Sequence, residues 1–126
     1  MKNKNTYWII AGYISGFSFF IHLLLGQETL VKPLLESNLN LQVKTELLAV
    51  WHMVSIVLLA TPFVYFYYGI KNLASSIMIC LLSNLYLVFG VIFIVCGFIH
   101  TVFVPQWTLL LPIGIFGLLG IKKHSL

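Results

Sequence analysis

Charged residues are scarce in this chain, and aspartate and arginine are absent. The 126 residues include seven lysines and three glutamates, so that charged residues make up 8% of the chain. Hydrophobic residues make up 60%, and the mean hydropathy is +1.03. A soluble domain carries about 25% charged residues, and a disordered chain needs low hydrophobicity. The composition therefore excludes both classes and predicts an integral membrane protein.

Several chemical motifs are also missing. The only cysteines are Cys80 and Cys96, which excludes a disulfide-rich scaffold and the C-x-x-C pair of thiol oxidation. The sequence contains no glycine-rich phosphate loop, nucleophile elbow or H-E-x-x-H zinc motif. The long uncharged stretches contain no acidic residue, which argues against an ion-coupled transporter.

Three stretches without charge are long enough to cross a membrane. Residues 7–26 and 47–70 each suit one crossing, since a helix needs roughly 20 apolar residues to span the hydrocarbon. Residues 72–121 suit two crossings, with a break near Pro105, because proline favours the first turn of a new helix. We therefore expect one all-α transmembrane domain over residues 1–126, a four-helix bundle; three crossings with one very long helix is the less favoured alternative. The predicted helices cover residues 7–25, 47–70, 73–100 and 104–121.

The lysines predict the orientation in the membrane. With four crossings, five lysines fall on one side, whereas the predicted outer loop 27–46 contains charges of both signs. By the positive-inside rule both termini are cytoplasmic. No small-x-small cleavage site follows the first apolar run, so we expect the first helix to be retained as an anchor. The five lysines are Lys2, Lys4, Lys71, Lys122 and Lys123.

The outer loop has a weak helical pattern of its own. Apolar residues recur at helical spacing between Leu30 and Leu35, which is typical of a short amphipathic segment on the membrane surface, begun or bent at Pro33. An ordinary surface loop is the alternative. Thr45 is the expected N-cap of the second helix.

Glycines recur at spacings that favour close helix packing. Gly12 and Gly16 form a G-x-x-x-G in the first helix, and Gly114, Gly117 and Gly120 follow one another at a spacing of three in the last. Small residues let membrane helices approach closely. We expect them to pack the bundle, with a homodimer contact as the alternative.

Three histidines fall at one depth once this topology is assumed. His22, His52 and His100 each lie near the outer end of a predicted helix. Ionisable groups inside spans usually face the bundle interior and mark functional sites. Neutral imidazole is also the commonest metal ligand and can bind haem iron. The pattern predicts a histidine-lined site near the outer face.

Further polar and aromatic residues occur at the same level. They give a cofactor-binding set of the three histidines with Trp51, Trp107 and Gln106, and a metal-ligand set of the same histidines with Glu28 and Cys96. Ser55, three residues from His52, is its expected hydrogen-bond partner. Haem, copper, iron and zinc are all compatible with histidine ligation. In the plain alternative, histidine, tryptophan and glutamine simply anchor the chain at the membrane interface.

Short motifs in the chain resemble those of a group of small bacterial inner-membrane proteins with four helices. The motifs are His22-x-x-x-Gly26, Trp51-His52, Pro105-Gln106-Trp107 and Leu111-Pro112-Ile113-Gly114. The resemblance covers most of the chain. It implies a multi-pass protein of the bacterial inner membrane and implies no activity.

Two functions remain open from the sequence. The first is a metal or haem site at the outer face, with redox chemistry or quinone binding as its enzymatic form. The second is a non-catalytic subunit or assembly factor of a larger membrane complex, or a homo-oligomer, in contact with the lipid bilayer. The net charge of +4 reflects membrane orientation, and we expect no nucleic-acid partner.

Overall fold

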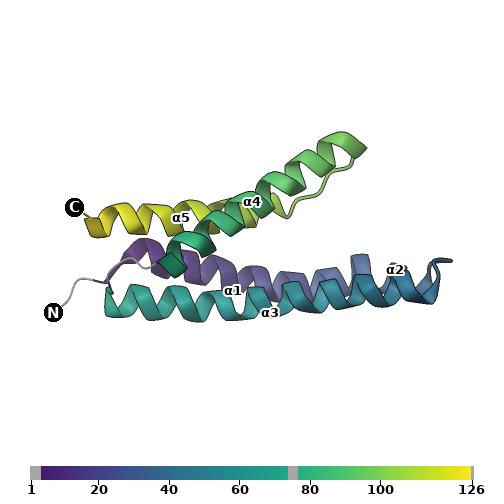
Figure 1. Ribbon diagram of the computed structural model, residues 1–126, viewed down its shortest axis with the longest axis horizontal. Coiled ribbons are helices and arrows are strands. Elements are labelled where there is room, and N and C mark those ends of the chain that lie inside the picture. The colour runs from purple at the N-terminus through teal and green to yellow at the C-terminus, as the bar shows by residue number, and fades with distance from the viewer. Residues whose placement is uncertain (1–3, 74–76, 126) are drawn as a thin grey trace.

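The protein is all-α in the computed structural model, which describes residues 4–73 and 77–125 (Figure 1). Four long helical segments are present in this part of the chain, as the sequence predicts. Apolar segments of this kind must be helical in a bilayer, because only a helix satisfies every backbone polar group within one segment. The elements are α1 (Thr6–Gly26), η1 (Gln27–Val31), α2 (Lys32–Glu36), α3 (Leu41–Lys71), α4 (Ile77–His100) and α5 (Trp107–Ser125).

Three of the helical segments are long and apolar enough to cross a membrane. They are the continuous segment Thr6–Glu36, α3 and α4. Large apolar side chains cover their outward faces, among them Phe17 at 60% and Phe63 at 68% exposure. Such a surface suits contact with lipid, and the chain has the features of a multi-pass membrane protein.

The predicted outer loop is mostly helical. The first helix does not end at residue 25 but continues through the π-helical turn η1 into α2, so only residues 37–40 connect it to α3. The π-turn lies just before Pro33, and a widened turn gives the proline ring room beside the preceding carbonyl groups. The segment around Pro33 is helical, as its apolar spacing predicts, but it continues from the first helix instead of being separate from it.

The second predicted helix also begins earlier than residue 47. Asn40 is the N-cap of α3, since its Oδ1 accepts a hydrogen bond of 2.9 Å from the Val43 N–H. Thr45, the predicted cap, lies inside the helix and donates to the Leu41 carbonyl. The fourth helix begins at Trp107 rather than 104, whereas α4 ends at His100 as predicted. Residues 74–76 of the predicted third helix lie outside the described part.

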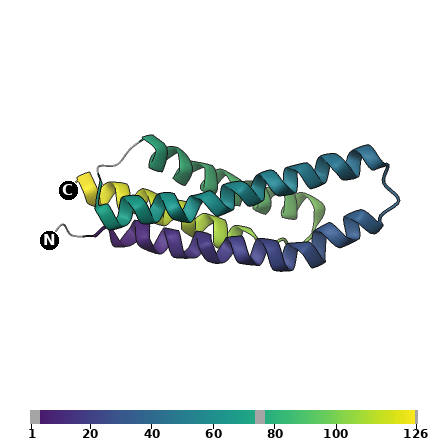
Figure 2. The same ribbon diagram turned by 90° about the horizontal axis from the view of Figure 1, so that it is seen from below.

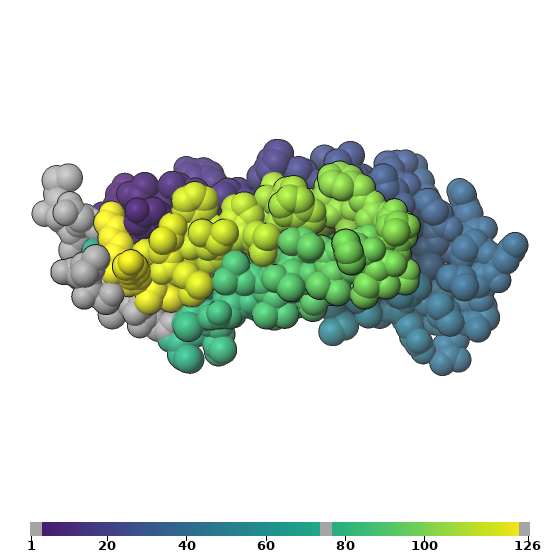
Figure 3. All heavy atoms as spheres, turned by 90° about the horizontal axis from the view of Figure 1, so that it is seen from above, coloured from purple at the N-terminus to yellow at the C-terminus, as the bar shows by residue number. Residues whose placement is uncertain are grey.

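The helices form two hairpins, α1–α3 and α4–α5 (Figures 1 and 2). The last helix, α5, packs against both α4 and α1, whereas α4 meets α3 only over a short length. The α4–α5 hairpin turns well before the tip of the α1–α3 hairpin. In Figure 3 the blue tip of the α1–α3 hairpin therefore projects beyond the green turn that follows α4.

Asn5 ties three segments together where both chain termini lie. Its backbone N–H donates to the Gly69 carbonyl at 2.9 Å, and its Nδ2 donates to the Gly120 carbonyl at 2.8 Å. Asn5 precedes α1, but its side chain makes no capping hydrogen bond to that helix. We call this end of the molecule the lysine end, since Lys4, Lys71, Lys122 and Lys123 all belong to its helix termini. Lys2 lies outside the described residues.

The core is built on the glycine face of α5, which consists of Gly114, Gly117 and Gly120. The Trp8 indole N–H of α1 donates to the Gly117 carbonyl at 3.0 Å. The Tyr65 hydroxyl of α3 and the Ser83 hydroxyl of α4 lie 3.0 Å apart against the same glycine, where a Cβ atom would collide with both oxygens. A Cβ at Gly120 would collide with Trp8 in the same way. Helix packing within the bundle is thus what these glycines serve.

A substitution at this face should destabilise the bundle. In Gly117→Ala the new methyl group overlaps Ser83 and Tyr65, so we expect the free energy of unfolding to fall by about 2–3 kcal/mol. Gly16→Ala is the matched control, because its Cβ meets only Pro62 Cβ at 3.8 Å. It should be neutral or stabilise by up to about 1 kcal/mol through helix propensity. Unfolding by SDS in mixed micelles measures both; equal losses would contradict the packing argument.

Candidate functional site

His22 and Trp51 form the centre of the predicted site. Their rings are stacked, with centroids 3.7 Å apart and planes inclined by 19°. His22 Nε2 lies 2.9 Å from Ser55 Oγ, and the Ser55 hydroxyl donates to the Trp51 carbonyl, also at 2.9 Å. Because the serine has a single proton, its oxygen is left to accept from an Nε2–H tautomer of His22. The imidazole is therefore held by both a ring face and a hydrogen bond.

Gly26 makes this stack possible. It follows His22 by four residues and lies on the same face of α1, where a Cβ atom would collide with the Trp51 ring. The H-x-x-x-G motif of α1 and the tryptophan of the W-H pair are thus two halves of one helix contact. Ser55, predicted as the partner of His52, belongs to His22 instead.

The remaining predicted site residues do not contact the His22–Trp51 stack. His52 follows Trp51 on α3, and it is exposed because successive residues of a helix point in directions about 100° apart. His100, Cys96 and Gln106 are exposed near the turn between α4 and α5. Glu28 forms an exposed ion pair with Lys32, one turn along the same helical segment.

No three-histidine metal site forms. Within residues 4–73 and 77–125, no three His, Cys, Asp or Glu side chains come together in a way that could hold a metal ion. The C-terminal part of α4, which ends at His100, diverges from α1 and α3 (Figure 1). A shared depth in the membrane does not bring side chains together when their helices separate. Ligation of a metal or haem by fewer of these residues stays a prediction.

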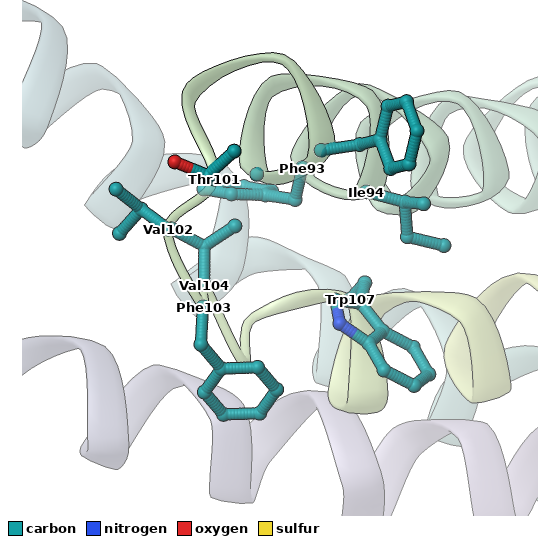
Figure 4. Close-up of a pocket in the computed structure, with 9 residues that line it drawn as sticks. Phe93, Ile94, Thr101, Val102, Phe103, Val104 and Trp107 are labelled. Carbon is teal, nitrogen blue, oxygen red and sulfur yellow. The ribbon is translucent and has the colours of Figure 1, made fainter.

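A hollow lies between the C-terminal part of α4 and the start of α5 (Figure 4). It has a volume of about 830 Å³ and is open to the surroundings. Its walls come from α4, the connection 101–104 and Trp107, and they are almost wholly apolar. Thr101 lies at its rim with φ of 53°, an uncommon left-handed conformation for a β-branched residue, and its hydroxyl donates to the His100 carbonyl. The predicted binding of a quinone stays a prediction.

Sequence reasoning missed the polar contacts nearer the lysine end. The Tyr86 hydroxyl of α4 donates to Thr61 Oγ1 of α3 at 2.7 Å, and Tyr65 pairs with Ser83 as described above. All four side chains are buried. Tyrosine, serine and threonine within charge-free spans are the signal that could have found them, since polar side chains in a membrane seek partners on neighbouring helices.

No known protein family matches the chain, and neither a curated protein nor a solved structure is significantly similar to it. The geometry of the described residues is therefore the basis for any functional argument.

A series of substitutions at His22 separates a structural role from ligand binding. Ser55→Ala removes the hydrogen bond to His22 together with the local one to the Trp51 carbonyl. His22→Phe keeps the stack but loses the bond to Ser55, so each variant should cost about 1 kcal/mol. His22→Ala removes both contacts and should cost about 2–3 kcal/mol. Unfolding in mixed micelles ranks the three variants.

Haem absorbance and metal content on the same proteins provide the control. A cofactor that is retained by Ser55→Ala but lost by His22→Phe would show that His22 is a ligand, and would contradict a purely structural role for its ring.

Proposed function

We propose that this is a four-crossing protein of the bacterial inner membrane that acts as a non-catalytic subunit or assembly factor of a larger membrane complex. The proposal rests chiefly on the tip of the α1–α3 hairpin, which rises beyond the other helices and exposes apolar side chains. The resemblance of the short sequence motifs supports the bacterial setting.

The fourth crossing and the orientation follow from the lysine end. Helix α5 lies beside α4 and α1 and returns the chain to the end where α1 begins (Figure 1). Lysines from three separate segments lie at that end, whereas the tip of the α1–α3 hairpin has charges of both signs. The positive-inside rule then makes the lysine end cytoplasmic.

Reporter fusions test this topology. A reporter inserted at Asn38 should be active only outside the membrane, and one fused after Leu126 only inside. Alkaline phosphatase and green fluorescent protein give the two readouts. The same side for both positions would contradict four crossings.

The α1–α3 hairpin is longer than the membrane is thick. Its α3 arm has 31 residues, which at about 1.5 Å per residue makes about 46 Å, whereas the hydrocarbon is about 30 Å thick. With the lysine end at the cytoplasmic surface, the outer ten or so residues of each arm lie among the outer headgroups or in water.

Apolar side chains remain uncovered on this projecting part. Leu41 is 78% exposed, and Leu30, Leu35 and Leu39 are 47–49% exposed. The α4–α5 hairpin ends too early to cover them (Figure 3). Exposed apolar patches outside the hydrocarbon mark sites of contact with other proteins. We infer that the tip binds the outer part of another membrane subunit.

Photo-crosslinking in cells tests this contact. A photoreactive residue at Leu41 should form an adduct with one protein of defined mass. At Phe63, which is similarly exposed but lies in the hydrocarbon, it should react with lipid only. Leu41→Gln should abolish co-purification of that partner and leave the unfolding midpoint unchanged, because Leu41 is outside the core. Adducts with lipid alone at Leu41, or the same protein adducts at Leu41 and Phe63, would contradict the proposal.

A further inference from the structure

One face of α4 is exposed along the length of the helix. Apolar residues follow one another on it at alternating spacings of four and three, the repeat of a left-handed helix pair. The apolar members are between 48% and 73% exposed. We call this face the α4 seam; it consists of Ile77, Leu81, Asn84, Val88, Val91 and Val95.

Asn84 is the one polar member of the seam. Between Ile77 and Val95 it is the only exposed polar side chain, and it lies about 10 Å along the helix from Ile77, well inside the hydrocarbon. Its Nδ2 bonds only within its own helix, to the Cys80 carbonyl at 2.8 Å and to Cys80 Sγ at 3.5 Å. Within the described part of the chain, its Oδ1 accepts no hydrogen bond.

An exposed carboxamide in hydrocarbon is stabilised when another polar group forms hydrogen bonds with it. A polar group without such a partner is costly there, and asparagine forms hydrogen bonds between membrane helices. A partner at this depth must present a polar group of its own. A second copy of this chain presents the same carboxamide, which has both a donor and an acceptor, at the same depth.

We propose that the α4 seam is the contact of a parallel homodimer in which the two Asn84 side chains bond to each other. All copies enter the membrane in one orientation, so a pair related by a twofold axis along the membrane normal has its two α4 helices parallel. In such a pair each residue of the seam faces its own counterpart. Val88 and Val95 occupy the heptad position that alternates with that of Asn84, and β-branched residues at one heptad position occur in two-stranded packing.

This contact is separate from the tip of the α1–α3 hairpin. It needs no other protein and is tested on the purified chain alone. Failure of the homodimer proposal would therefore leave the proposed partner at Leu41 unaffected. Failure of the Leu41 proposal would likewise leave the homodimer unaffected.

Energy transfer between labelled copies in lipid vesicles measures the pairing. Asn84→Leu should weaken dimerisation about tenfold, because it removes the bond between the helices. Its fold should be unchanged, since Asn84 bonds only within α4. In the Asn84→Leu background, Val91→Asn places the carboxamide one heptad further along the seam and should restore pairing. Leu85→Asn, off the seam, should not.

Disulfide trapping locates the face independently. In a chain with Cys80→Ala and Cys96→Ala, a cysteine at Val91 should cross-link two copies on oxidation. A cysteine at Ile92 should not, although the two positions are 52% and 50% exposed. A monomeric wild type at every protein-to-lipid ratio, equal pairing by Asn84→Leu and the wild type, or equal trapping at 91 and 92 would each overturn the proposal.

Discussion

A bilayer offers no water to a polar group, and the fold depends on how this chain meets that constraint around α5. Trp8, Tyr65 and Ser83 come from three different helices and converge on Gly117, where the absence of a side chain lets two hydroxyl groups and an indole lie close to one backbone. Apolar packing alone would hold membrane helices together weakly, since lipid tails are equally apolar. The glycine face of α5 therefore determines which helices become neighbours.

The same constraint explains what the sequence could predict. Charge-free stretches gave the helix class and the four segments, and Pro105 placed the break after His100 correctly to within a few residues. Pro33 predicts a short segment that is begun or bent at this residue, and α2 does begin beside it, but the helix is continuous with α1. A single π-turn lets the helix pass through Pro33. Composition predicts that these segments are helical. Whether a helix continues past a proline depends on the geometry of one turn, which composition does not predict.

At the candidate site, the sequence predicts the depth of the histidines but not which side chains meet. Helix direction and residue count predict that His22 and His52 lie at one level. The His22-x-x-x-Gly26 and Trp51-His52 motifs stand in the sequence, but it does not predict that Gly26 lies against Trp51. The rotation of each helix about its axis is not predicted either. That rotation turns His22 onto Trp51 and Ser55, and it leaves His52 exposed. Depth follows from counting residues, but convergence follows from packing.

The hydrogen bond from Asn5 to Gly120 also has a consequence for biosynthesis. The two residues are 115 positions apart, so the amide that precedes α1 meets its acceptor only after α5 has been made. Until α5 packs against α1, Asn5 and Trp8 lack their hydrogen bonds to that helix. A helix made late thus completes the packing of one made early, and chains that lack α5 would present Asn5 without this hydrogen bond to the cell's membrane quality control.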